Sequence, residues 1–279
     1  MAWWTIARLT FREAARRKIL WAALGLGVVF LVVYGVGYNL ILQDVHEFGR
    51  SNNPLVRSEV SSFFMMAGLY AVNFLTVMMT VLTSVDTLSG EIASGTIHTL
   101  VSKPVRRWEV LAGKWLGYSI LLMLYLVLMA GGVVAIVYAL SGYQPPHLAR
   151  GLILMLMNSL LLLSVSLLGG TTLSTLANGV MVFGLYGIAF VGGWVEQMGA
   201  LLQNASAVNV GVVSSLILPS EALWRRAVYE MQSAGAGMLG GMTPFSAVSV
   251  PSPMMIVYAV IYLLVVLGLA FRRFQTRDF

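Results

Sequence analysis

The sequence predicts an all-α polytopic membrane protein, and three observations support this prediction. Of the 279 residues, 58% are hydrophobic and only 10% are charged, whereas soluble domains carry about 25% charged residues. The apolar residues form runs long enough to cross a bilayer as helices, which takes about 20 residues. Most of the positive charges stand between these runs. We therefore expect one transmembrane domain over residues 1–279.

Six apolar runs are predicted to be transmembrane helices. A long uncharged stretch over 151–195 is divided in two by "STLANG" (Ser174–Gly179), because its polar and glycine residues favour a turn. Asp86 and Glu196 stand at span ends and are interpreted as boundary residues. The predicted spans are approximately 19–42, 62–85, 115–140, 151–173, 180–195 and 254–271.

The basic residues predict the orientation of the spans. With six spans, one side receives the N-terminus, the 86–114 loop, the 174–179 turn and the C-terminus, with twelve Lys and Arg against five on the other side. Lys and Arg mark the cytoplasmic side, so both termini are expected in the cytoplasm. Since these residues border helix ends and form no separate basic domain, we expect no nucleic-acid partner.

The segment 197–253 is expected at the outer face. A seventh span at 197–218 would place the basic C-terminus outside, so this stretch is interpreted as an outer-face or re-entrant element. A helix is expected to start at Pro219–Ser220, with charged residues such as Glu221 and Arg225 on its surface. The segment is either a gate over an exit or a structural collar.

The N-terminal residues 1–18 form an amphipathic pattern. Trp4 belongs to an apolar face at helical spacing, and Arg8, Arg12 and Arg16 follow one another at intervals of four on another face. This pattern is typical of an interfacial helix that lies on membrane lipid. The alternative is that these residues are only the positive flank of the first span.

A second amphipathic segment, 87–103, lies between the second and third spans. Ala93, Ile97, Leu100 and Val101 share one face of a helix, and polar side chains cover the other. Pro104 ends the segment. Trp108 and Trp115 follow it, at spacing suited to the water–lipid boundary. From these residues alone, the segment either binds a partner or simply lies on the lipid headgroups.

The stretch "SGEIASGTIHTLVSKPVRRWEVLAGKWLG" (Ser89–Gly117) resembles the ABC-2 type ABC transporter permeases. These proteins often carry an acidic residue, Gly-Thr, a hydrophobic helix, Lys-Pro, a basic pair and Gly-Lys in this order. The matching residues here are Glu91, Gly95, Thr96, Lys103, Pro104, Arg106, Arg107, Gly113 and Lys114.

The resemblance implies a permease without a fused ATPase domain. Such a subunit would belong to an exporter and would dimerise with a second permease subunit, as a homo- or heterodimer, in a prokaryotic inner or cell membrane. The segment 87–103 would be a coupling helix that docks a separate ABC ATP-binding subunit. The docking residues implied are Glu91, Ser94, Gly95, Thr96, His98 and Thr99.

The chain carries no ATPase motif of its own. Ala112–Trp115 contains Gly-Lys, but Trp115 replaces the Ser or Thr that a phosphate loop requires. No catalytic or metal-binding constellation is visible, so we expect no enzyme activity, metal or cofactor in this chain, with ATP and Mg bound by the partner subunit. The substrate-binding residues are not identified. The alternatives are a motor-free scaffold or assembly protein, a channel, and an intramembrane enzyme, the last disfavoured by spans without clustered ionisable residues.

Overall fold

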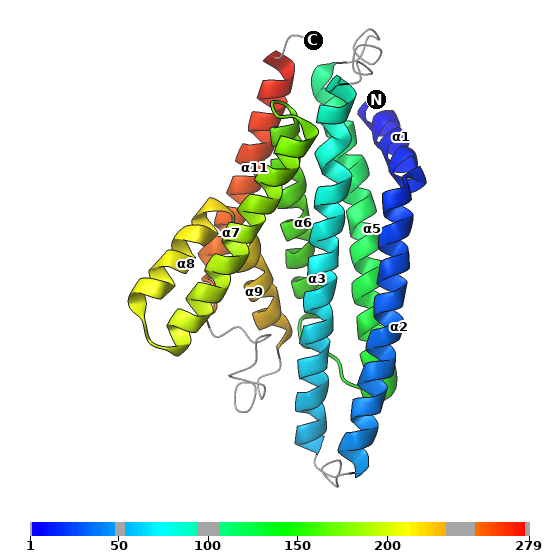
Figure 1. Ribbon diagram of the computed structural model, residues 1–279, viewed down its shortest axis with the longest axis vertical. Helices are drawn as coiled ribbons and strands as arrows, with labels where there is room; N and C mark the ends of the chain where they lie inside the picture. Colours follow the sequence, from blue (N-terminus) through cyan, green and yellow to red (C-terminus); the bar gives the residue numbers. More distant parts are fainter. Residues whose placement is uncertain (1, 48–53, 94–105, 233–248, 277–279) are drawn as a thin grey trace.

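The computed structural model describes residues 2–47, 54–93, 106–232 and 249–276. Every regular element in these ranges is an α-helix (Figure 1). The helices are α1 (Ala2–Arg16), α2 (Lys18–Glu47), α3 (Pro54–Ala93), α5 (Arg107–Ser141), α6 (Leu148–Gly170), α7 (Thr175–Leu201), α8 (Ala205–Ile217), α9 (Ser220–Met231) and α11 (Pro253–Thr276).

Six of these helices are long and apolar enough to cross a membrane: α2, α3, α5, α6, α7 and α11. The predicted all-α fold with six spans is therefore confirmed. The two ends of the described chain lie at the same end of the bundle (Figure 1). We call this the inner end, and it also holds α1, the end of α3 and the turn between α6 and α7. The opposite end is the outer end.

The third helix continues beyond the span predicted for it. It runs without a break from Pro54 to Ala93, so residues 87–93 belong to α3 and not to a separate coupling helix. The polar residues near its end are compatible with a helix because their hydroxyl groups donate to carbonyls one turn earlier, as Thr87 does to Thr83 and Ser89 to Val85. Residues 94–103 of the predicted coupling helix lie outside the described residues.

The predicted N-terminal helix is present as α1, and it packs against α5. A side chain at Gly113 would meet the backbone oxygen of Trp3 at 2.7 Å, and one at Gly117 would meet that of Ala7 at 2.8 Å. Two glycines four residues apart let two helix backbones approach closely. The first turns of α5 are thus shaped to receive α1.

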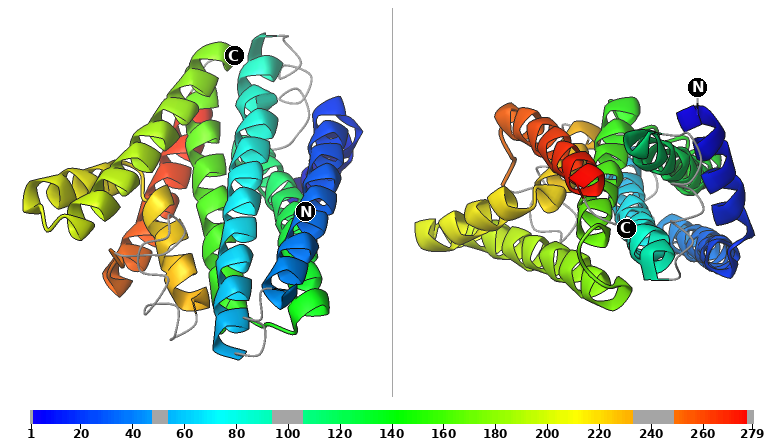
Figure 2. Two further views of the ribbon diagram at one scale, coloured as in Figure 1. Left: turned by 60° about the horizontal axis from the view of Figure 1, so that its bottom comes forward. Right: turned by 90° about the horizontal axis from the view of Figure 1, so that it is seen from above.

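The outer-face segment forms a helical hairpin and a bend. α8 packs along α7, and Figure 2 shows this pair projecting away from the α2–α3–α5 side of the bundle. α8 and α9 meet at an angle of 107°. Because both termini lie at the inner end and six helices already span the membrane, the α8–α9 pair fits a re-entrant element, one of the two forms expected for 197–218.

Because glycines of α5 contact α1, we expect a bulky side chain to destabilise the protein at Gly117 but not at Gly131. Gly117→Leu should lower the free energy of unfolding by about 1–3 kcal/mol, because the new side chain overlaps the backbone of α1. Gly131→Leu is the matched control on the same helix, since a Cβ there meets nothing within 4 Å. Thermal unfolding in mild detergent measures both, and equal melting temperatures would contradict the packing described.

Candidate functional site

The inner end of α3 is joined to α5 by a buried ion pair. The ammonium group of Lys114 lies 2.5 Å from a carboxylate oxygen of Glu91, and it also donates to the backbone oxygen of Thr87 at 3.5 Å. The Lys114 side chain is 5% exposed and that of Glu91 is 17% exposed. Because little water reaches the pair, each charge depends on the other for its stabilisation.

The same end of α3 is joined to α1 through Asp86. Arg17, directly after α1, lies 3.5 Å from the Asp86 carboxylate and 2.9 Å from that of Glu13. The Asp86 side chain is 51% exposed, which agrees with its interpretation as a boundary residue. An exposed pair of this kind contributes little stability on its own, so it mainly sets the position of α1 relative to α3.

A third set of contacts joins α3 to the start of α7. The hydroxyl groups of Ser89 and Thr175 lie 2.9 Å apart. The buried amide of Asn178 donates to the backbone oxygen of Val85 at 3.2 Å and to that of Ser166, on α6, at 2.9 Å. The last turns of α3 are therefore held by side chains from α5, α7 and the end of α1, directly before the segment predicted to dock a partner.

The six predicted docking residues stand differently in the structure. Glu91 faces Lys114 inside the bundle, which gives this carboxylate a role in joining helices. Its docking role stays a prediction. The other five, Ser94, Gly95, Thr96, His98 and Thr99, lie outside the described residues, so their docking role also stays a prediction.

The predicted interface anchors lie in two kinds of environment. Trp4, Arg8, Arg12 and Arg16 are exposed on α1, and Trp108 is 38% exposed at the start of α5. Trp115 instead packs between helices, where its indole N–H donates to the Ser164 hydroxyl on α6 at 3.0 Å. That hydrogen bond gives Trp115 a helix-packing role, which its spacing from Trp108 did not indicate.

The outer end contains a second buried ion pair, which sequence reasoning missed. The guanidinium of Arg225 on α9 binds both carboxylate oxygens of Glu196 on α7, at 2.6 and 2.7 Å. The side chains are 2% and 6% exposed. Glu196 was expected as a boundary residue and Arg225 on a helix surface. Glu196 is the only charged residue between Arg150 and Glu221 and so required a partner. Arg225, however, adjoins Arg226 in a charged helix, and nothing local marked it as that partner.

Further polar groups surround this pair. Ser249 donates its hydroxyl to Glu196 at 2.7 Å, and Arg225 also donates to Ser215 at 3.4 Å. Glu221, one turn before Arg225, is 3% exposed and interacts electrostatically with both members of the pair. It too was expected on a helix surface. Its burial follows from the close approach of α9 to α7 at Gly193, where a Cβ would overlap the Glu221 side chain.

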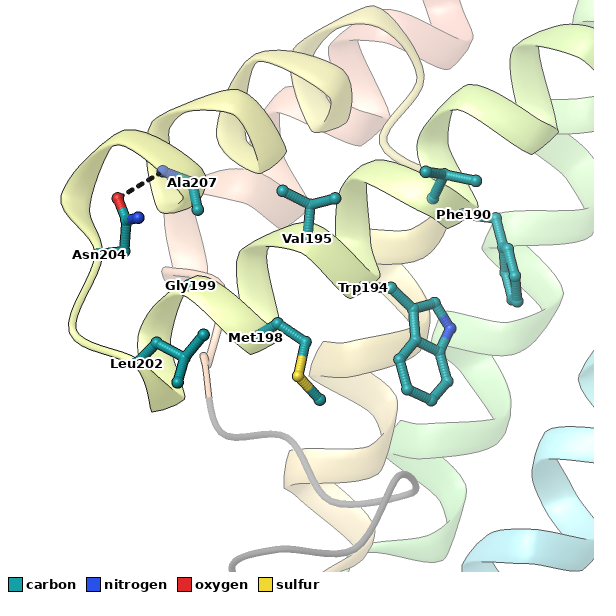
Figure 3. A pocket seen from close by; sticks show the side chains of 9 residues that line it. Phe190, Trp194, Val195, Met198, Gly199, Leu202, Asn204 and Ala207 are labelled. Carbon is teal, nitrogen blue, oxygen red and sulfur yellow. Dashed lines mark hydrogen bonds between the residues drawn. The ribbon is translucent and has the colours of Figure 1, made fainter.

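Two grooves on the surface are almost entirely apolar. One, of about 550 Å³, follows the α7–α8 hairpin, where Phe190, Trp194 and Met198 project from one side of α7 (Figure 3). The other, of about 710 Å³, lies between α3 and α7 near the inner end, with Asp86 and Thr175 among its lining residues. Neither groove offers the convergent polar groups that a catalytic site needs.

For the Glu91–Lys114 pair, we expect one substitution to lower the free energy of unfolding more than both substitutions together. Lys114→Met should lower the free energy of unfolding by about 3 kcal/mol, because it leaves the Glu91 carboxylate buried without its cation. Adding Glu91→Gln should recover most of this loss. Thermal unfolding of the purified variants checks both statements, and a double variant as unstable as the single one would contradict the pairing.

Comparison with known proteins identifies the family of this chain. Among curated proteins no match is found. The sequence model described as "ABC-2 family transporter protein" matches residues 4–279, which include both buried ion pairs and all six spans. The match confirms the family that the Ser89–Gly117 stretch resembles. Proteins of this family are the membrane subunits of ABC transporters and carry no ATPase domain. The chain therefore belongs to the ABC-2 transporter family, as an integral multi-pass membrane component of an ABC transporter.

Proposed function

We propose that this chain is the permease subunit of an ATP-driven exporter and that it binds separate ATP-binding subunits at its inner end. The observation that carries the proposal is the joining of the last turns of α3 to α1, α5 and α7. The chain that leads from Ala93 to Arg107 contains five of the six predicted docking residues, and Glu91 lies just before it in α3. A force applied to that chain reaches three other elements within one or two turns of α3.

The proposed mechanism uses ATP and Mg bound by the partner subunits. ATP binding would draw two such subunits together and shift the permease between inward- and outward-open states. This requires the ATP-binding subunits to bind the two states with different affinity. In this chain, the Glu91–Lys114 pair would keep the ends of α3 and α5 together, so that both helices move as one unit.

Export is the direction that the placement of the grooves favours. The groove between α3 and α7 lies beside Asp86, close to the inner end. On the outer side stands the α8–α9 pair, in which α9 is tied to α7 by Glu196 and Arg225. With the inner end in the cytoplasm, as the excess of Lys and Arg there favours, cargo would enter from the cytoplasm and leave past α9.

The proposed transporter contains two permease subunits. The groove between α3 and α7 is the surface best suited to a second protomer, because Gly179 and Gly184 line it and small residues allow close helix approach. The exposed side of α2 carries larger residues such as Val32 and Val36. We propose that this side of α2 faces lipid.

A co-purification experiment tests the docking proposal. The tagged chain, extracted from its own membranes in mild detergent, should carry an ATP-binding subunit with it. Gly95→Trp should abolish this association, because the bulky side chain fills the predicted docking face. Gly131→Trp is the control, since position 131 on α5 is exposed and has nothing within 4 Å of a Cβ.

Three outcomes separate the alternatives. Loss of the ATPase with Gly95→Trp alone supports both the permease function and the docking face. Retention with both variants keeps the function and overturns the docking face. A folded wild-type chain that never carries an ATPase favours a motor-free scaffold, or a channel if it conducts in liposomes without nucleotide.

Cysteine cross-linking tests the proposed dimer seam, and the chain has no cysteine of its own. In a two-fold dimer, a residue close to the axis meets its own copy. At least one of Val180→Cys, Phe183→Cys and Gly184→Cys should therefore give a disulfide-linked dimer on oxidation in membranes. Val32→Cys on α2 should stay monomeric. Cross-linking at position 32 and at none of the groove positions would place the seam on α2.

A further inference from the structure

The buried ion pair at the outer end has no explanation in stability alone. Replacing a buried ion pair by apolar residues of similar size is often neutral or stabilising, because taking both charges out of water costs more than their attraction returns. Charged residues inside membrane proteins commonly mark moving or functional parts. Glu196 and Arg225 are 6% and 2% exposed, and so belong to this class.

The packing around the pair places α8 with α7 and α9 with α6. α7 and α8 touch backbone to backbone, because side chains at Gly199 and Gly211 would lie 2.9 Å from Val208 N and 2.6 Å from Gly192 O. This hairpin is held by close packing and needs no charge. α9 packs along α6, where a Cβ at Gly151 would overlap Met231, and it contacts α7 through Glu221 at Gly193 and through the Arg225 guanidinium.

Polar groups near the pair offer each charge an alternative partner. Ser249 binds Glu196, and the Ser215 hydroxyl lies within reach of Arg225. Three buried groups on α9, the Ser220 hydroxyl and Nε of Arg225 and of Arg226, have no hydrogen bond within the described part of the chain. A buried polar group without a partner favours any arrangement that supplies one, such as contact with water. The closed position of α9 is therefore weakened by these groups and maintained by the ion pair.

We propose that Glu196 and Arg225 are a positioning pair that holds α9 against α7 and closes the outer end, and that the two side chains separate when the transporter opens outward. Its link to the ATP cycle rests on the proposed function. In this proposal the outer-face segment is a gate over the exit, not a structural collar, because the pair holds α9 in place and then releases it. Glu221, buried beside the pair, moves with Arg225 because both lie on one face of α9.

Labelling from the outer side tests the proposal. Ser215→Cys places a thiol at a 1% exposed position beside Arg225, in a chain that otherwise has no cysteine. With the transporter complex in nanodiscs, a charged maleimide should react slowly without nucleotide. With Mg and a non-hydrolysable ATP analogue, the labelling rate should rise at least about tenfold as α9 leaves α7. Ser206→Cys, exposed near the start of α8, is the control and should react equally in both conditions.

Glu196→Gln, combined with Ser215→Cys, tests the closing role without a motor. The variant should raise the labelling rate at least about tenfold in the absence of nucleotide, because Arg225 has lost its counter-charge. The double substitution Glu196→Gln and Arg225→Gln removes both members of the ion pair, leaves only Glu221 of the three buried ionisable groups, and should also label fast. This double variant replaces the single variant if the single variant misfolds. Gel filtration checks the folding of both.

The outcomes distinguish failure of this proposal from failure of the proposed function. Slow labelling in the folded double variant overturns the closing role and leaves a static collar. A second outcome combines fast labelling of the double variant with a Ser215→Cys complex that hydrolyses ATP but labels at the same rate with and without nucleotide. This outcome overturns the separation of Glu196 and Arg225 during transport. If no ATP-binding subunit associates, the proposed function fails, and the labelling of the charge-removed variants still decides whether the pair closes the outer end.

Discussion

The structure depends on one physical constraint, which is that a charge removed from water requires a partner. Each end of the bundle contains an ion pair that is largely shielded from water, Glu91–Lys114 at the inner end and the more deeply buried Glu196–Arg225 at the outer end. Each pair joins two helices that are distant in the sequence, so the requirement for a counter-charge becomes a requirement on helix position. Within the hydrocarbon region the same constraint acts on hydroxyl groups. Thr76, Thr80 and Thr83 on α3 each donate to a carbonyl of their own helix, and α3 stays continuous through a polar stretch.

Between the two ion pairs, glycine residues allow the helices to pack closely. Lipid removes the hydrophobic drive that holds soluble helices together, so close van der Waals packing has to replace it. Gly113 and Gly117 admit the backbone of α1, while Gly199 and Gly211 bring α7 and α8 into contact. The glycines fix which helices touch, and the ion pairs fix how far along one another those helices lie.

The sequence predicted the parts of the structure that follow from local patterns. Apolar runs of sufficient length predicted the six spans, and the helical spacing of Trp4, Arg8, Arg12 and Arg16 predicted α1. It could not predict contacts between distant segments. Glu196 and Arg225 are 29 residues apart, and each alone is typical of a span boundary or a helix surface. The packing of Trp115 against Ser164 depends likewise on where α6 lies, which no local pattern indicates. The full length of α3 was also not predicted, because Asp86 was interpreted as a boundary residue whereas the hydroxyls of Thr87 and Ser89 bond within a helix that continues to Ala93.

One helix, α7, connects the end of α3 with the Glu196–Arg225 pair. α7 begins at Thr175, next to the end of α3, and contains Glu196 close to its outer end. Its 27 residues correspond to about 40 Å of continuous helix at 1.5 Å per residue. A helix without proline or an internal break moves as a rigid body, so a displacement at Thr175 is transmitted to Glu196 with little loss. The Glu196–Arg225 pair is short and directional, and a shift of about one ångström along the helix axis would lengthen both of its hydrogen bonds beyond good geometry. The coupling proposed between a motor at the inner end and closure at the outer end therefore needs no chain of small side-chain movements, because a single rigid helix that is bound at both ends is sufficient.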